Sequence, residues 1–218
     1  MKYIQKRTEP QEFVDWKTDF PSWNDGRAAN YDDLQNPLKN QVKQSLIEEQ
    51  GKICCYCGMR IDARNTHIEH LKPQQHCTPE ESVDYHNIVA SCEGENKKVH
   101  CGHNKHNWHD EALFVSPLHE NCAAHFVYTY DGKILPCEDS ELVPKARETI
   151  FQLGLDSEKL NALRRVAWEP ILYLEDLTIA DIDAYLQACD TPNDQGEFPE
   201  YAAAVQSILQ VEKRKMLS

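Results

Sequence analysis

The sequence predicts an α+β protein, with a small ligand-rich module that follows an N-terminal helix and precedes a C-terminal helical lobe. Three observations carry this prediction. Apolar residues recur at three-to-four spacing in residues 37–50 and again through the last third of the chain, which is typical of amphipathic helices. Residues 126–135 alternate around an Asp-Gly pair, which predicts a β-hairpin. Eight of the ten histidines and six of the nine cysteines fall within residues 51–110.

Composition excludes several classes of protein. With 218 residues and 40% apolar residues, the chain can bury a core, so wholesale disorder is excluded. No apolar run approaches the ~20 residues that cross a bilayer, and the first residues do not resemble a secretory signal. We therefore expect a soluble, cytoplasmic protein with no membrane partner. In a reducing cytosol, cysteines indicate metal ligands or reactive thiols before they indicate disulfides.

The net charge of −13 is unevenly distributed along the chain. Residues 138–218 carry 8 basic and 16 acidic groups, a local balance of −8. Proteins that bind nucleic acid alone are usually basic, because phosphate contacts dominate their affinity. If nucleic acid is the substrate, its site must be small and local, or another subunit must supply the basic surface.

The first helix is expected at residues 37–50, where apolar side chains recur between Leu38 and Leu46 and Gly51 can close the C-terminus. The upstream segment, residues 16–26, is expected to be irregular, either a packed arm or a partner-binding extension. After the hairpin we expect four helices, at residues 141–153, 157–174, 178–188 and 199–215. Pro170 should kink or interrupt the second of these, and Thr178 with Asp181 resembles a capping box.

Two cysteine pairs are candidates for a structural metal site. Cys54 and Cys57 have the half-site spacing of a zinc knuckle. Cys92 and Cys101 could supply the second half, although the gap between them is longer than usual. Four thiolates would form a closed, structural tetrahedral site. The alternative is that these are ordinary buried cysteines, and Cys55 could substitute in register.

Glu69 and His70 form a second candidate site. Adjacent residues on a strand point to opposite faces, so a short strand must end at this pair if both are to act together. A carboxylate can bind a hard ion such as Mg²⁺, and an imidazole can accept a proton near neutral pH. On its own this pair is a weak signal, because Glu-His pairs are common on surfaces.

Taken together, these elements resemble the HNH endonuclease superfamily over roughly residues 51–108. In order, they are the Cys54/Cys57 pair, Glu-His-x-x-Pro at 69–73, Asn-Ile-Val-x-x-Cys at 87–92 and Cys-x-His-x-Lys at 101–105. The resemblance implies a ββα-metal fold, in which a hairpin and a helix surround one catalytic divalent ion, Mg²⁺ or Mn²⁺. It also implies that the four cysteines hold a structural Zn²⁺ under the hairpin.

Carried over residue by residue, the resemblance implies five roles. Glu69 would be a ligand of the catalytic ion, and His70 would be the general base that activates water. Asn87 would brace the loop that holds the base. His103 would supply the last metal ligand, and Lys105 would face a substrate phosphate.

In one position the chain departs from many zinc-bearing members, which place the final His or Asn directly after the last cysteine. Here Gly102 intervenes, so His103, Asn104 and Asn107 compete for the ligand role. We favour His103, with Asn107 next because it would lie one helical turn on. Five other polar residues of the module are expected to be surface or loop groups: His76, His86, Lys97, Lys98 and His100.

A closer resemblance is to the PtuB family, the HNH subunits of Septu-type anti-phage systems, including versions attached to retrons. It is carried by Cys-x-Tyr-Cys-Gly at 54–58, Ile-Glu-His-x-x-Pro at 68–73, Cys-Gly-His-x-Lys at 101–105 and the elements that follow. That family works with an ATPase, PtuA, and the retron versions with a reverse transcriptase and its RNA–DNA. Such a partner could hold the nucleic acid for an acidic nuclease subunit.

The resemblance therefore implies a metal-dependent endonuclease subunit of a bacterial anti-phage defence complex, with DNA as the favoured substrate. Two alternatives stay open: the same site could cleave RNA such as tRNA, or the chain could be a non-catalytic zinc adaptor for an ATPase. We expect three segments: an N-terminal arm and helix (1–50), the nuclease module with its hairpin (51–137) and a helical lobe for partner binding (138–218).

Overall fold

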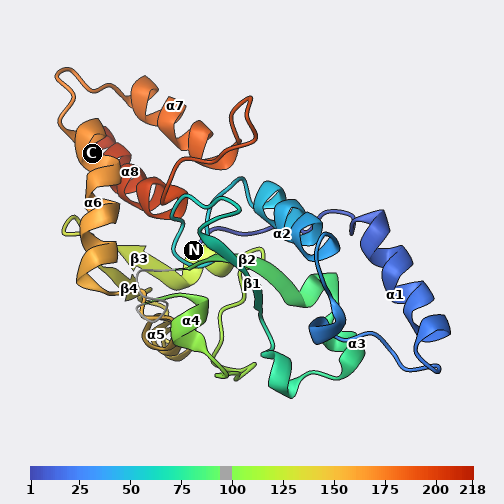
Figure 1. Ribbon diagram of the computed structural model, residues 1–218. Coiled ribbons are helices and arrows are strands. Elements are labelled where there is room, and N and C mark those ends of the chain that lie inside the picture. Colours follow the sequence, from blue (N-terminus) through green and yellow to red (C-terminus); the bar gives the residue numbers. More distant parts are fainter. Residues whose placement is uncertain (94–99) are drawn as a thin grey trace.

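Two small antiparallel sheets lie in the middle of the molecule, with α1 and the C-terminal helices at opposite ends (Figure 1). This computed structural model describes residues 1–93 and 100–218, so the expectation for Lys97 and Lys98 lies outside the described residues. Helices and short antiparallel sheets together confirm the α+β class. No helix in the described part of the chain is both long and apolar enough to cross a membrane.

The first sheet pairs β1 (Thr66–His70) with β2 (Ile88–Cys92). β1 ends at the Glu69-His70 pair, as the sequence analysis required. The register places Thr66 opposite Cys92 and His70 opposite Ile88. Every residue of β2 is buried, which fits a strand with an apolar run rather than an alternating one. The strands are joined by α3 (Pro79–Ser82) and two short 3₁₀ turns, η2 (Gln74–His76) and η3 (Tyr85–Asn87).

Helix α2 (Leu38–Glu49) confirms the first predicted helix and packs against both β1 and β2. The prediction of an irregular arm before it is wrong, because Gln11–Trp23 forms helix α1. Its signal is an aromatic stripe: the rings of Phe13 and Trp16 stack with centroids 5.7 Å apart, and Phe20 meets Trp16 edge-on at 5.4 Å. Pro21 lies inside the helix, which ends two residues later.

After β2, the short helix α4 (Gly102–Lys105) is followed by the predicted hairpin, which consists of β3 (Phe126–Tyr128) and β4 (Ile134–Pro136). Its turn needs a glycine, because Gly132 has a φ of +89°. A Cβ there would lie 1.9 Å from the carbonyl oxygen of Asn161, so the turn also packs closely on α6 (Glu158–Leu172).

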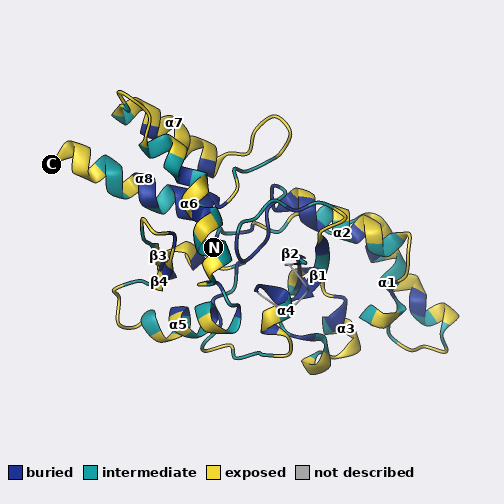
Figure 2. Cartoon of the chain, turned by 60° about the vertical axis from the view of Figure 1, so that its left-hand side comes forward, coloured by how far each residue is buried: buried dark blue, intermediate teal, exposed yellow. Residues whose placement is uncertain are grey.

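The four predicted C-terminal helices are all present: α5 (Val143–Gln152), α6 (Glu158–Leu172), α7 (Ile179–Asp190) and α8 (Ala202–Leu217). Pro170 lies inside α6, which ends two residues later. The capping box of α7 is confirmed, with Thr178 and Asp181 exchanging backbone-to-side-chain hydrogen bonds. Figure 2 shows α7 largely exposed, whereas the first sheet is buried.

One continuous core runs from Met1 to Leu209. Backbone hydrogen bonds cross the expected segment boundaries: Ile4 N donates to Pro117 O at 2.9 Å, and Cys101 N donates to Leu153 O at 2.7 Å. The three predicted segments therefore pack against one another, and their division into separate domains stays a prediction.

Candidate functional site

The four predicted cysteines converge in one buried cluster. Cys54 and Cys57 come from the loop before β1, Cys92 ends β2 and Cys101 precedes α4. Sγ of Cys54 lies 3.8 Å from that of Cys101, and Sγ of Cys57 lies 3.7 Å from that of Cys92. A tetrahedral Zn²⁺ with bonds of about 2.3 Å separates its sulfur ligands by about 3.8 Å. These sulfur atoms therefore fit a tetrahedral metal ion.

His100 is part of the surroundings of this cluster, and the expectation that it lies at the surface is wrong. The side chain is fully buried. Its Nδ1 lies 3.2 Å from Sγ of Cys101 and 3.7 Å from Sγ of Cys92, where it can donate to a thiolate. Such hydrogen bonds to metal-bound sulfur orient the ligands and offset their charge.

Glu69 is buried near the end of β1, among polar side chains. Its Oε1 accepts hydrogen bonds from Nζ of Lys105 at 3.0 Å and from the Tyr56 hydroxyl at 3.2 Å. Its Oε2 lies 3.4 Å from Nε2 of His67. Burial would raise the pKa of Glu69, but His67 and Lys105 outweigh burial and hold that pKa below its ordinary value. The carboxylate is therefore ionised and already has two neighbours that stabilise its charge.

Lys105 lies inside the protein, where no substrate phosphate could reach it without rearrangement. Its side chain is almost fully buried, and Nζ donates to Glu69 and to the backbone oxygen of His70 at 2.8 Å. A buried ammonium group requires a charged partner and hydrogen bonds, and the end of β1 supplies both. The structure thus gives Lys105 a different environment from the one that the family resemblance implies.

His70 is held in one orientation. Its Nε2 donates to the backbone oxygen of Ser82 at 2.8 Å, and the Tyr31 ring meets it edge-on, with ring centroids 4.5 Å apart. The hydrogen bond places the ring proton on Nε2, which leaves Nδ1 as the proton acceptor of the neutral ring. Burial lowers the pKa of His70 below its ordinary value, so the imidazole is neutral at physiological pH.

Asn87 connects the two ends of the segment that joins β1 to β2. Its Oδ1 accepts a hydrogen bond from the backbone N of Lys72 at 2.8 Å. Its Nδ2 donates to the backbone oxygens of Lys72 and Glu81, both at 3.2 Å. These contacts fix the chain that follows His70, the geometry expected of a bracing residue.

A second group of potential metal ligands is formed by His67, Glu93 and His103, whose ligand atoms all lie within 4.8 Å of one another. Nε2 of His103 lies 2.9 Å from Oε2 of Glu93, and the two imidazole rings lie 4.2 Å apart. Nδ1 of His67 is buried and has no hydrogen-bond partner within residues 1–93 and 100–218. A buried ring nitrogen without a partner is expected where an ion completes the site.

The sequence analysis identified only His103 of these three residues. His67 precedes Glu69 by two positions on β1, a spacing that puts both side chains on one face of the strand. Glu93 directly follows Cys92, and its backbone N donates to Asn65 O at 2.8 Å, which extends the strand pairing by one residue beyond Thr66 and puts Glu93 on the same face as His67. The strand alternation could have indicated His67, whereas nothing in the motif indicated Glu93.

Of the three residues that competed to be the last ligand, only His103 lies in this cluster. Nδ2 of Asn104 donates to Gln152 O at 2.9 Å. Helix α4 ends at Lys105, and His106 has a φ of +49°, so the helical turn that would align Asn107 does not form. The expected ligand Glu69 lies next to the cluster, in contact with His67.

Gly102 leaves room for the side chains of Glu69 and His67 to lie in contact. A Cβ at this position would lie 2.3 Å from Oε2 of Glu69 and 2.7 Å from Nε2 of His67. Heavy atoms do not approach so closely, so any larger residue would displace one of these side chains. The glycine that interrupts the usual motif therefore provides the space in which Glu69 and His67 are in contact.

Two curated proteins are similar to the chain, and no family model matches it. The "Retron Vc95 putative HNH endonuclease" of Vibrio cholerae serotype O1 biovar El Tor is 30% identical over 142 residues, which cover 63% of this chain and 68% of that protein. The "Retron Ec83 putative HNH endonuclease" of Escherichia coli is 26% identical over 206 residues, which cover 76% of this chain and 78% of that protein.

Proposed function

Because the chain belongs to the HNH endonuclease family, we propose that it hydrolyses phosphodiester bonds of nucleic acid, with DNA favoured, in the pocket formed by β1, β2 and α4. The observation that carries this proposal is the ligand cluster of His67, Glu93 and His103, which adjoins the Glu69-His70 pair. In this proposal, β1, β2 and α4 are the ββα-metal unit, and the four-cysteine cluster is its structural zinc site.

His67, Glu93 and His103 fit a catalytic divalent ion, with Glu69 in reach as a further ligand or as a partner that orients His67. Such an ion neutralises negative charge that develops on the scissile phosphate and on the leaving oxygen. Two imidazoles favour Mn²⁺ over Mg²⁺, because Mg²⁺ prefers oxygen ligands. We therefore propose Mn²⁺ as the better of the two expected ions.

The role proposed for His70 is that of general base. With Nε2 donating to Ser82 O, the free Nδ1 can take a proton from an attacking water. The lowered pKa keeps that nitrogen available at neutral pH. Asn87 supports this arrangement by fixing the segment after His70.

We also propose that the chain works in a retron-type system, because both relatives are named as retron HNH endonucleases, and that this system acts against phage, as the resemblance to the PtuB family implies. The acidic C-terminal lobe supports a division of labour, in which a PtuA-like ATPase or a retron reverse transcriptase with its RNA–DNA presents the nucleic acid. The zinc-adaptor alternative is less well supported, because a structural zinc site alone does not require a second ligand cluster, in which a buried imidazole nitrogen has no hydrogen-bond partner among the described residues.

The test uses wild type and His70→Gln with plasmid DNA and total tRNA, each with Mn²⁺ or Mg²⁺ and each with and without the ATPase. Glutamine can keep the hydrogen bond to Ser82 O but cannot act as a base near neutral pH. We expect the cleavage rate to fall by about 10²–10⁴-fold at unchanged zinc content. His86→Gln, the same change at an exposed histidine, is the control and should cleave normally.

Equal cleavage by wild type and His70→Gln would reject the assignment of the base. Absence of cleavage by wild type under every condition, including with the ATPase, would favour the adaptor alternative. The nucleic acid that is cleaved decides between the DNA and RNA alternatives.

A further inference from the structure

We propose that the cavity between α2 and the free edge of β1 binds the phosphodiester backbone of the substrate strand and leads it to the ligand cluster. This inference rests on the proposed nuclease function. The cavity has a volume of about 480 Å³ and is lined by Tyr31, Gln35, Asn36, Lys39, Asn40, Lys43, Thr66, His67 and Ile68.

The lining of this cavity is unusual for such an acidic protein. The chain has 36 acidic and 23 basic residues, yet the nine lining residues include two lysines and no carboxylate. The other polar members are amides, hydroxyls and one imidazole, which can donate hydrogen bonds to phosphate oxygens. The cavity is therefore a small, local basic site, which an acidic protein needs if it is to bind nucleic acid.

The two lysines carry charges that no carboxylate of the described residues neutralises. Lys39 and Lys43 lie one turn apart on α2. Nζ of Lys39 lies 4.3 Å from the centre of the Tyr31 ring, and Nζ of Lys43 donates to Ala63 O at 2.8 Å and Thr66 O at 3.4 Å. Neither ammonium has a carboxylate within ion-pair distance in the described ranges. In the same ranges nine other lysines do have such a partner: Lys2, Lys6, Lys17, Lys52, Lys72, Lys105, Lys133, Lys213 and Lys215.

The cavity also adjoins the proposed catalytic groups. His67 lines it and belongs to the ligand cluster. Tyr31 lines it as well, and its ring touches His70 on one side and Lys39 on the other. Within residues 1–93 and 100–218, β1 pairs only with β2, and Thr66, His67 and Ile68 of β1 form one wall of the cavity. A strand bound there would reach the cluster and the base together.

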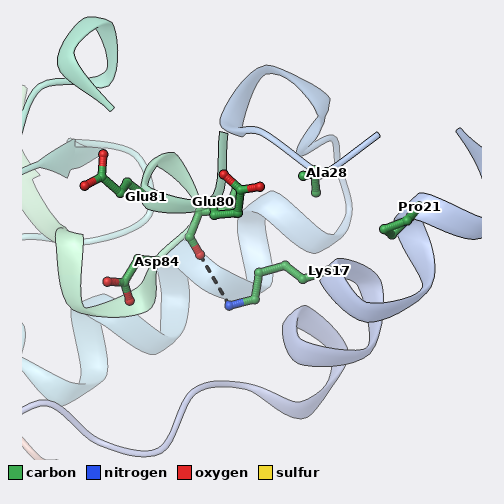
Figure 3. A pocket seen from close by; sticks show the side chains of 8 residues that line it. Lys17, Pro21, Ala28, Glu80, Glu81 and Asp84 are labelled. Carbon is green, nitrogen blue, oxygen red and sulfur yellow. Dashed lines mark hydrogen bonds between the residues drawn. The ribbon is translucent and has the colours of Figure 1, made fainter. Parts of the chain in front are cut away.

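A second cavity has a similar size but the opposite charge. The cavity between α1 and α3 has a similar volume of about 440 Å³. Figure 3 shows that Glu80, Glu81 and Asp84 line it, together with Lys17. Lys17 is neutralised by Glu9 and also donates to Val83 O. This acidic cavity would repel a phosphate, which makes it the natural control for the basic one.

The test measures the binding of labelled duplex DNA, single-stranded DNA and RNA by fluorescence anisotropy at several salt concentrations. All proteins carry His70→Gln, so that the nucleic acid stays intact. Lys39→Gln should reduce the slope of log affinity against log salt by about 0.9 on duplex DNA, or about 0.7 on a single strand. Between about 50 and 200 mM salt, the affinity of the Lys39→Gln protein should therefore fall by a factor roughly threefold smaller than that of the protein with Lys39.

Two matched variants separate a specific contact from a general loss of charge. Lys17→Gln removes the same charge from the acidic cavity and should leave the slope unchanged, and Lys39→Arg should restore it. The nucleic acid on which Lys39→Gln has its largest effect identifies the strand that the cavity binds.

Three results would overturn the inference. One is an unchanged slope for Lys39→Gln on every nucleic acid while wild type still cleaves, which leaves the nuclease proposal intact. Another is an equal loss for Lys17→Gln and Lys39→Gln. The third is the absence of both cleavage and binding by wild type with the ATPase present, which would reject the nuclease proposal as well.

Discussion

The cysteine cluster and the His67–Glu93–His103 cluster are built from neighbouring residues of the chain but differ in what surrounds them. Cys92 is followed by Glu93, and Cys101 is two residues from His103. The four cysteines are buried, whereas the side chains of His67, Glu93 and His103 are 20%, 30% and 26% exposed. A closed set of four ligands is typical of structural metal sites, and an open set of three is typical of catalytic ones. In the proposed assignment, one short strand and one helical turn supply ligands to both kinds of site.

The largest expected effect tests the structural side of this comparison. Cys57→Ser removes one of four thiolates from a buried site, and zinc binding of about 10–16 kcal/mol drives folding in small zinc domains. We expect loss of bound zinc and of cooperative thermal unfolding, measured by elemental analysis and circular dichroism. Cys137→Ser, at a cysteine outside the cluster, is the control and should retain both. A folded Cys57→Ser protein with full zinc content would show that the cysteines are ordinary core residues.

The second prediction concerns the open cluster. His103→Ala should leave zinc content and thermal stability nearly unchanged but weaken Mn²⁺ binding by more than about 100-fold, because removal of even an indirect partner of a metal ligand costs 10–100-fold. The binding can be measured by electron paramagnetic resonance of Mn²⁺. His106→Ala is the control on the next turn of the chain. If both variants bind Mn²⁺ as wild type does, the cluster is not the site of the catalytic ion.

The smallest expected effect comes from Gly102, which lies between the two clusters. Gly102→Ala places a methyl group within 2.3 Å of Glu69 Oε2 and 2.7 Å of His67 Nε2, and overpacking typically costs about 1–3 kcal/mol. We expect a modest loss of stability in chemical denaturation, intact zinc and a partial loss of Mn²⁺-dependent cleavage. Loss of zinc instead would mean that the glycine serves the cysteine cluster. Unchanged cleavage would mean that contact between Glu69 and His67 is not needed.

The helices and the ends of the strands could be predicted because their signals are local. The apolar spacing of α2, the Asp-Gly turn of the β3–β4 hairpin and the capping box of α7 all depend on residues within a few positions of one another. The prediction failed for α1, where Pro21 and the scattered aromatic residues obscured a helical stripe.

By itself, the sequence determined the α+β class, the grouping of chemistry-bearing residues in one module and the strand that ends at Glu69 and His70. Only the tertiary structure decided which side chains meet. The register of β1 against β2 places Glu93 on the same face as His67, burial turns Lys105 inward to Glu69, and the packing of α2 beside β1 creates a cavity whose two lysines have no carboxylate partner among the described residues. These contacts join residues that are far apart in the chain. They depend on strand pairing and on the cost of burying an uncompensated charge, neither of which a local motif expresses.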